Sequence, residues 1–156
     1  MVRGHQLAML LRGAYLTLHR QAQQLFAPFG VTADQFVLLS LLAKQDGVIQ
    51  QDLVRRSSSD PNTVRAILVR PEQQGLISRR EHEHDGRARM VRLTSKGRRL
   101  QRLLMRQSRA FHQAVSASVP KEHWDAVVGC LEDVREGISA KGTRGKRKSL
   151  ERSAAR

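Results

Sequence analysis

Residues 50–97 constrain the fold more than any other stretch, because they combine two short helical segments with a charged hairpin. The segment QQDLVRRSSSDPNT predicts a short helix and a serine-rich turn, and Asp60 followed by Pro61 is a typical start of a second helix. Leu76 to Arg80 and Arg89 to Leu93 are predicted to be strands, and the polar segment EHEHDGR between them contains an Asp-Gly turn pair. The pattern indicates a helix-turn-helix followed by a β-hairpin wing, an architecture that binds duplex DNA.

The segments before this stretch predict two supporting helices. Apolar residues recur at three- and four-residue spacing from His5 to Phe26, which is typical of an amphipathic helix. Thr32 and Gln35 have the spacing of a capping box, in which each side chain accepts a hydrogen bond from the other residue's backbone N–H. The helix that begins there is apolar on nearly all sides, so we expect it to be the central buried helix, closed by Gly47.

Two further helices are predicted after the hairpin. Thr94 can cap a long helix that runs to about Val119, and Pro120 opens a last helix with apolar residues at helical spacing. The residues after Ile138 have no apolar pattern and should be disordered. The expected fold is mainly α with a small β-hairpin wing, in a single domain over residues 1–138: a winged helix-turn-helix at 32–97, flanking helices at 5–27 and 94–138, and a disordered basic tail at 139–156.

Pro71 interrupts the helical pattern of the second helix of the helix-turn-helix. A proline inside a helix lacks the N–H for one backbone bond and clashes with the carbonyl four residues earlier, at a cost of about 3 kcal/mol. It also disfavours helical geometry at Arg70, the residue before it. We therefore expect this helix to kink or stop near Arg70, with Gly75 completing the exit.

The formal net charge of +14 is concentrated in two segments. Residues 55–109 carry a net +10 and residues 139–156 a net +6, while the remainder is slightly acidic. This distribution suits a polyanion, because each neutralised phosphate releases condensed counterions. An anionic membrane surface is the rival partner, but binding it would need a strong apolar face beside the charge, and the basic tail has none.

Other features of the composition favour a reduced, cytoplasmic protein with no membrane partner. Cys130 is the only cysteine, so an intrachain disulfide is impossible. The sequence has neither an apolar run of membrane-spanning length nor a recognisable signal peptide. It also lacks nucleophile motifs, paired catalytic carboxylates, glycine-rich phosphate loops and HExxH, so we do not expect an enzyme.

The second helix of the helix-turn-helix has the chemistry of a base-reading helix. Val64, Ile67 and Leu68 should face the core, which leaves small and hydrogen-bonding residues beside arginines on the other faces. Arginine can bond guanine, asparagine can bond adenine, and threonine or alanine can meet the thymine methyl. Arginines near the wing should contact phosphates or, at the tip, a narrow minor groove. The candidate DNA-binding residues are Ser59, Asn62, Thr63, Arg65, Ala66, Val69, Arg70, Arg79, Arg80, Arg87 and Arg89.

His82 and His84 raise the possibility of a metal site, and Cys130 that of a redox switch; each has a simpler explanation. His82 and His84 alternate with acidic residues and could form a metal clip, but they lie at the exposed tip of a hairpin, so a solvated tip is favoured. Cys130 adjoins Leu131 on an amphipathic helix, which predicts an inert buried thiol rather than a redox switch. No metal or cofactor is therefore predicted.

A pocket for an acidic effector is the remaining candidate site. Aromatic residues of the supporting helices could line it, with two polar residues one helical turn on either side of an aromatic ring. At helical spacing, each of the aromatic residues is better explained as part of the core. The candidates are Arg12, Tyr15, His19, Phe36 and Phe111.

Two segments carry a resemblance to a known family. GLISR at residues 75–79 and DGRARMVRLTSKG at residues 85–97 resemble the corresponding segments of the multiple-antibiotic-resistance regulator (MarR) family of winged-helix repressors. The order of predicted elements is similar to that family over roughly residues 7–138. Ser57 and Ser59 stand where the family usually has apolar residues, and Pro71 stands where it usually has leucine.

The resemblance implies a triangular homodimer with residues 5–27 and 94–138 as dimerisation helices. It implies that helix Pro61–Arg70 enters the major groove and that Arg87, oriented by a salt bridge to Asp85, reaches the minor groove. It further implies a small-molecule signal (such as an aromatic acid), a metal or an oxidant that changes the spacing of the two recognition helices. A two-fold dimer would read a pseudo-palindrome with half-sites one DNA turn, ~34 Å, apart. The function expected is a sequence-specific, ligand-responsive repressor of transcription, and the alternative is a non-specific architectural DNA-binding protein.

Overall fold

The structure, a computed structural model, describes residues 3–45, 47–82 and 84–138. The chain divides into two compact units, Met1–Phe111 and His112–Arg156, each described by itself below. The expectation of a single domain over 1–138 stays a prediction, and the predicted basic tail lies outside the described residues.

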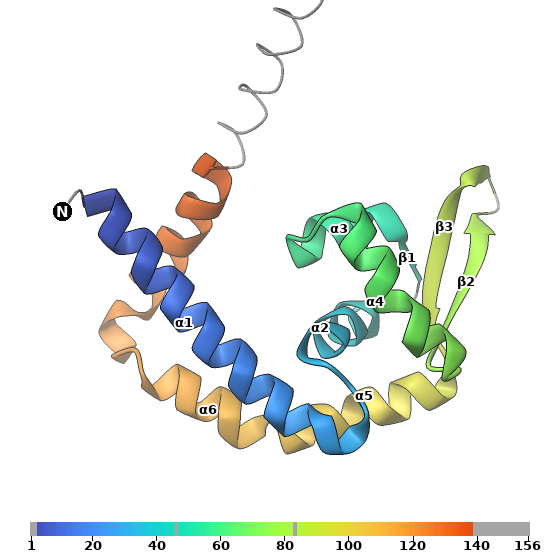
Figure 1. The fold of residues 1–156 in the computed structure, drawn as a ribbon, viewed down its shortest axis with the longest axis horizontal. Coiled ribbons are helices and arrows are strands. Elements are labelled where there is room, and N and C mark those ends of the chain that lie inside the picture. The colour runs from blue at the N-terminus through green and yellow to red at the C-terminus, as the bar shows by residue number, and fades with distance from the viewer. Residues whose placement is uncertain (1–2, 46, 83, 139–156) are drawn as a thin grey trace, which may run out of the picture. The chain divides into compact units, whose positions relative to one another are not determined.

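The first unit begins with the two predicted supporting helices (Figure 1). Helix α1 spans Arg3–Phe26, a 3₁₀ turn η1 spans Ala27–Phe29, and helix α2 spans Ala33–Ala43. The capping box is confirmed, because Thr32 Oγ1 accepts from Gln35 N at 3.1 Å and Gln35 Oε1 accepts from Thr32 N at 2.9 Å.

The prediction that Gly47 closes α2 is wrong. The helix ends at Ala43, and Gly47 has φ 86° on the approach to a short strand. A Cβ at Gly47 would lie 3.0 Å from Met90 Sδ and 3.1 Å from Arg92 Cζ. Glycine is therefore needed at this position for close packing beneath the wing rather than for helix termination.

Helix α2 lies at the centre of the first unit, as predicted. It contacts α1 and four of the later elements, namely α3, α4, α5 and β3. Phe36 on α2 stacks on Phe26, with ring centroids 4.2 Å apart. The fully buried apolar side chains of the core come from α2 itself and from the elements around it: Phe26, Leu39, Leu42, Val48, Leu53, Val64, Leu68, Val91 and Leu104.

Helices α3 and α4 form the helix-turn-helix. Helix α3 spans Gln50–Ser57 and α4 spans Pro61–Gln73. The chain turns at Ser58, which adopts the left-handed conformation with φ 54°. The serine-rich turn and the short first helix are confirmed, and the turn sets α4 across α3 (Figure 1).

We expected this helix to kink or stop near Arg70, with Gly75 completing the exit. It does not stop there, because it continues through Pro71 to Gln73, whereas the exit at Gly75 is confirmed. The helix end is a Schellman motif: Leu76 N donates to Pro71 O at 2.8 Å, and Gly75 N donates to Glu72 O at 2.9 Å. Gly75 takes the left-handed conformation, with φ 67°. Pro71 is buried and its carbonyl has a partner, so the lost N–H bond is offset at the last helical turn.

The sheet has three antiparallel strands in the order β1-β3-β2. Strand β1 spans Val48–Ile49, β2 spans Ile77–His82 and β3 spans Asp85–Leu93, with an irregularity between Glu81 and His82. The wing strands are longer than predicted and extend into the EHEHDGR segment, while β1 was not predicted at all. Val91 and Leu93 are buried, as their alternation indicated.

The long helix predicted after the wing is broken. Helix α5 spans Ser95–Gln107 and α6 spans Arg109–Ala117, separated at Ser108. The Ser108 hydroxyl donates to Met105 O at 3.2 Å, and Ser108 is fully buried. A serine that bonds back to the preceding turn competes with the regular backbone ladder, which accounts for the interruption.

Thr94 joins the end of the wing to the exit of α4. Its backbone N–H donates to Leu76 O at 3.0 Å, its hydroxyl donates to Gly75 O at 2.7 Å, and the hydroxyl oxygen accepts from Gly97 N at 3.0 Å. Lys96 Nζ adds a bond to Gln74 O at 2.7 Å. The start of α5 is thereby fixed to the end of α4.

The second unit contains a 3₁₀ turn η2, Lys121–His123, and a helix over residues 124–138, which confirms the helix expected after Pro120. Cys130 is exposed, so the prediction of a buried thiol is wrong. Leu131 beside it is also 47% exposed, because the apolar stripe of this helix is not covered within its unit.

Among the described helices, none is by itself both long and apolar enough to cross a membrane. Arg3–Phe29 and Ala33–Ala43 reach that length and apolar content only as a pair bent by 81°.

Candidate nucleic-acid interface

The N-terminus of α4 is fixed by Asp60. The Asp60 Oδ1 atom accepts from the backbone N–H groups of Asn62 and Thr63, each at 3.0 Å, and Oδ2 accepts from the Thr63 hydroxyl. The Thr63 hydroxyl bond, followed by its backbone N–H bond, lowers the pKa of the Asp60 carboxyl. Thr63 therefore has its hydroxyl proton engaged and offers a methyl group and an acceptor oxygen to a ligand.

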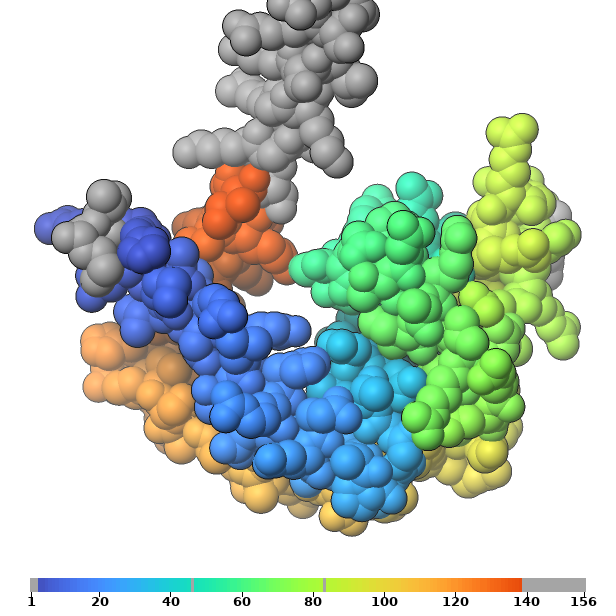
Figure 2. Space-filling model, viewed as in Figure 1, coloured from blue at the N-terminus to red at the C-terminus, as the bar shows by residue number. Residues whose placement is uncertain are grey.

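The α4 residues that we expected to face DNA lie on the outward side of the helix. Asn62, Arg65, Ala66, Val69 and Arg70 are all exposed, at three- and four-residue spacing along the helix. Val64 and Leu68, on the opposite face, are 0% and 1% exposed. Figure 2 shows α4 (green) on an open face of the first unit, with the wing projecting beyond it.

Arg87 lies exposed near the tip of the wing, on β3. Its backbone N–H donates to Asp85 Oδ1 at 3.0 Å. The contact with Asp85 thus runs through the backbone of Arg87, whereas the family resemblance implied a salt bridge with its guanidinium. The carboxylate stabilises the turn into β3, since an aspartate commonly bonds the N–H two residues ahead.

Arg79 is held by Glu72 of α4. Arg79 Nε donates to Glu72 Oε2 at 2.8 Å and a terminal guanidinium nitrogen donates to the same oxygen. The side chains are 24% and 36% exposed, and the hydrogen bond from Arg79 lowers the pKa of the Glu72 carboxyl. From the sequence we expected Arg79 to contact a DNA phosphate. In the structure its guanidinium is paired with Glu72, and this pair links α4 to β2.

Glu72 was not predicted from the sequence, since no local spacing rule joins a helix residue to a strand residue seven positions on.

Arg89 pairs with Glu81 across the wing at 3.0 Å, and both side chains are more than half exposed. Such an exposed pair contributes little stability and leaves Arg89 accessible to an anion.

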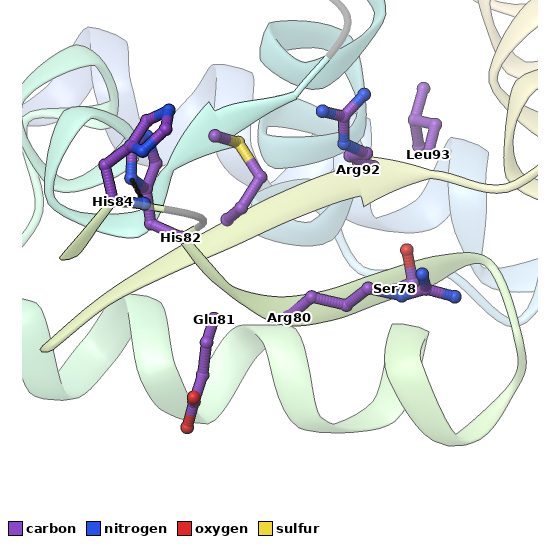
Figure 3. Close-up of a pocket in the computed structure, with 8 residues that line it drawn as sticks. Ser78, Arg80, Glu81, His82, His84, Arg92 and Leu93 are labelled. Atoms are coloured by element: carbon purple, nitrogen blue, oxygen red, sulfur yellow. Dashed lines mark hydrogen bonds between the residues drawn. The ribbon is translucent and has the colours of Figure 1, made fainter. Parts of the chain in front are cut away.

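The outer face of the wing is a shallow cationic hollow of about 530 Å³ (Figure 3). Arg80 and Arg92 line it with His82 and His84, and Glu81 is the one carboxylate among its lining residues. His82 Nδ1 accepts from the backbone N–H of His84 at 3.2 Å, which occupies one of the ring nitrogens a metal would need. Within the described ranges, no three His, Cys, Asp or Glu side chains gather as metal ligands.

The remaining predicted DNA contacts lie around this surface. Arg80 is exposed on β2, and Ser59, just before α4, is half-buried with its hydroxyl 3.4 Å from Ser57 O. The surface formed by α4 and the wing therefore gathers exposed arginines around a helix with small and amide side chains. This arrangement can hold phosphates with the wing while α4 presents groups to base edges.

The candidate effector residues are only partly brought together. The rings of Tyr15 and His19 lie 5.5 Å apart on α1, and His19 Nδ1 lies 3.8 Å from Asp34 Oδ1. Arg12 is exposed and Phe111 is half-buried. Phe36 is 8% exposed and stacks in the core, so it favours the packing interpretation for that residue.

Comparison with known proteins gives a consistent result. A model described as the MarR family matches residues 31–88. The uncharacterized HTH-type transcriptional regulator YdgJ of Bacillus subtilis is 29% identical over 110 residues, which are 70% of this chain and 67% of the relative. The organic hydroperoxide resistance transcriptional regulator of the same organism is 30% identical over 93 residues, 60% of this chain and 63% of that one. The chain thus spans about two thirds of the length of these relatives.

Solved structures share the fold over most of the chain. A mutant MarR from E. coli complexed with operator DNA aligns with a TM-score of 0.75 at 20% identity, covering 83% of this chain and 93% of the other. A structure on the regulation of DNA binding of BpsR of Bordetella bronchiseptica by 6-hydroxynicotinic acid aligns at 0.74 and 28% identity, covering 83% and 98%. These likenesses show a winged helix-turn-helix fold.

Proposed function

We propose that the chain is a MarR-family transcriptional regulator, a ligand-responsive repressor that binds a pseudo-palindromic operator as a homodimer; the match to the family model and the similarity to two regulators of Bacillus subtilis support this. The observation that carries the proposal is the outward face of α4, on which Asn62, Arg65 and Ala66 are exposed beside a wing rich in arginine. Helix α4 occupies the major groove, and Arg87 enters the adjacent minor groove.

Uncovered apolar side chains in both units support a homodimer. Leu7 and Leu10 on α1 are 46% and 65% exposed, and Val128 and Leu131 on helix 124–138 are 38% and 47% exposed. Exposed apolar side chains gathered along helices are typical of protein interfaces. A two-fold dimer places two copies of α4 on half-sites about one DNA turn, ~34 Å, apart.

The proposed effector is an aromatic acid that binds near Tyr15 and His19, with Arg12 on the same helix as its cationic partner. The support is the exposure and proximity of these polar and aromatic groups on α1, together with the named regulation of BpsR by 6-hydroxynicotinic acid. Effector binding lowers operator affinity by shifting the dimer toward a spacing of the α4 helices that does not fit the half-sites.

The test is selection of bound sites from random DNA, followed by titration of the selected duplex and a shuffled duplex at fixed salt. A specific regulator should prefer the selected duplex by about 10³-fold or more. Repeating the titration with a panel of aromatic acids should reveal one that weakens operator binding. Equal affinity for the two duplexes would contradict the proposal.

The second candidate function is a non-specific architectural DNA-binding protein, favoured by the net charge of +14. Both candidates predict a loss of affinity with salt, because phosphate contacts release counterions in either case. Only the sequence preference separates them, so the shuffled duplex is the deciding control.

A further inference from the structure

Helix α5 and the first residue of α6 carry a row of arginines that the operator-binding surface does not use. The row consists of Arg99, Arg102, Arg106 and Arg109, and all four side chains are exposed. The segment from Ser95 to Ala117 contains no aspartate or glutamate. We call these residues the α5 arginine row.

The row lies on the face of α5 that points away from the core. Successive residues of a helix are about 100° apart around its axis. Gln101 and Leu104 are buried, and each α5 arginine of the row lies two residues from one of them. The arginines are therefore about 200° away, on the opposite side of the helix, and the row from Arg99 to Arg109 is about 15 Å long.

This face does not look toward the reading surface of α4. Helix α2 contacts α3 and α4 as well as α5, so it lies between them. Figure 1 shows α5 (yellow) along the side of α2 opposite to α3 and α4. Since the row points away from α2, a duplex held by α4 lies on the other side of the first unit.

The row is electrostatically unfavourable in the isolated chain. Arg102 and Arg106 are four residues apart, a spacing at which like charges on a helix repel. Among the described residues, no carboxylate forms an ion pair with any member of the row. The repulsion is thus not relieved by a carboxylate of the described residues, and an external polyanion would relieve it.

We propose that the α5 arginine row binds the phosphate backbone of a second DNA duplex, so that the protein joins two DNA segments. That one of the segments is an operator held by α4 rests on the function proposed above. A duplex carries one negative charge per ~1.7 Å of axis, so a row about 15 Å long faces several phosphates. Arginine suits this partner because its planar fork bonds phosphate oxygens bidentately, and such contacts are independent of sequence.

The experiment is a bridging assay with the full chain. The operator duplex obtained by site selection is fixed to beads and saturated with protein, and capture of a labelled random-sequence duplex is measured. Changing Arg99, Arg102, Arg106 and Arg109 to Gln should reduce capture at least tenfold and leave operator affinity within about twofold. Changing the same four residues to Lys retains the charge and should retain most of the capture.

A matched control removes four charges elsewhere. Arg3, Arg20, Lys44 and Lys121 are exposed and lie outside both proposed DNA surfaces, so their change to Gln gives the same net charge. This variant should capture the second duplex nearly as well as the wild type. Unchanged capture by the row variant, or an equal loss in both Gln variants, overturns the proposal.

Further arms separate this proposal from the proposed function and from other polyanions. If the wild type fails to distinguish operator from shuffled duplex, the proposed function fails, and direct titration of random duplex with both Gln variants still tests the row. Vesicles of phosphatidylcholine and phosphatidylglycerol, and polyglutamate, are titrated in parallel. Binding to either that depends on the row, without binding to the second duplex, overturns DNA as its ligand. Thermal unfolding by circular dichroism confirms that each variant is folded.

Discussion

At the scale of single residues, Gly97 is the described glycine at which an added side chain would meet the closest contact. A Cβ there would lie 1.9 Å from Leu76 O, the carbonyl that also accepts from Thr94 N. Gly97→Ala should therefore force the start of α5 away from the end of α4 and lower the free energy of unfolding by about 3 kcal/mol or more. Urea unfolding of the purified variant measures this loss.

Gly13→Ala is the matched control for Gly97→Ala. A Cβ at Gly13 meets nothing within 4 Å, and Gly13 lies inside helix α1. Alanine is favoured over glycine in a helix, so this variant should be as stable as the wild type or more stable by about 0.5–1 kcal/mol. Equal urea midpoints for the two variants would contradict the argument from close packing.

Arg65 and Arg80 test the two kinds of DNA contact. Arg65 lies on the exposed face of α4, and Arg80 is exposed on the wing. Arg65→Ala should cost about 1–3 kcal/mol on the selected operator and relax the preference at one base position, because a base contact is lost. Arg80→Ala should weaken operator and shuffled duplex alike and reduce the salt dependence by about one phosphate contact. Competition binding against a set of single-base operator variants distinguishes the two patterns.

At the scale of the elements, the Glu72–Arg79 pair links α4 to β2 and makes stability depend on pH. The pKa of Glu72 is lowered in the folded chain by the hydrogen bond from Arg79. A carboxyl whose pKa is lower in the folded state than in the unfolded state stabilises the fold at pH values above its unfolded-state pKa. This contribution is lost as the pH falls through the folded-state pKa.

Glu72→Gln should therefore be less stable than the wild type at pH 7, with a difference that shrinks as the pH falls below about 4.3, the ordinary pKa of glutamate. Urea unfolding of both proteins between neutral and acid pH measures the difference. Arg89→Gln is a suitable comparison, since its exposed pair with Glu81 should contribute little at any pH. A difference for Glu72→Gln that is constant over the whole range would show that ionisation of this carboxyl is not the cause.

The elements also show what the sequence could predict. Helix starts depend on short-range hydrogen bonds, and those at Thr32, Asp60 and Thr94 were all readable from residue type and spacing. Strand β1 was not readable, because Val48 pairs with Val91, far along the chain. A two-residue strand is decided by its partner rather than by its own propensity.

The end of α4 shows why a local rule can fail. Pro71 carries a real cost inside a helix, but the rule considers only the lost bond and the clash. The bonds from Leu76 and Gly75 and the burial of Pro71 itself become visible only when the exit turn is built. The candidate site shows the same difference between local and long-range information. The exposed face of α4 was predicted from helical periodicity, whereas the pairing of Arg79 with Glu72 could be seen only in the folded structure.

At the scale of the whole molecule, the uncovered apolar side chains of α1 make assembly testable. Leu10 is 65% exposed, and in the proposed dimer it is buried against the partner. Leu10→Glu would place a charge in that interface and should raise the dimer dissociation constant by at least tenfold, or about 1.4 kcal/mol. Sedimentation velocity over a range of protein concentrations measures the change.

Val69→Gln gives the reciprocal control at this scale. Val69 is 41% exposed on α4, so its change should weaken operator binding and leave the dimer dissociation constant unaltered. A Leu10→Glu protein that sediments like the wild type at every concentration would exclude this face of α1 from the dimer interface.

The bonds of Thr94 have a consequence for the order in which the chain folds. The hydroxyl that caps α5 through Gly97 N also bonds Gly75 O, nineteen residues earlier. Both ends of the wing must therefore be together before this cap is complete, so the hairpin has to close before the first turn of α5 is fully stabilised. Loop closure over a short hairpin carries a small entropic cost, which favours early formation of the wing. The cap thus makes completion of the first turn of α5 depend on closure of the wing and on the exit of α4.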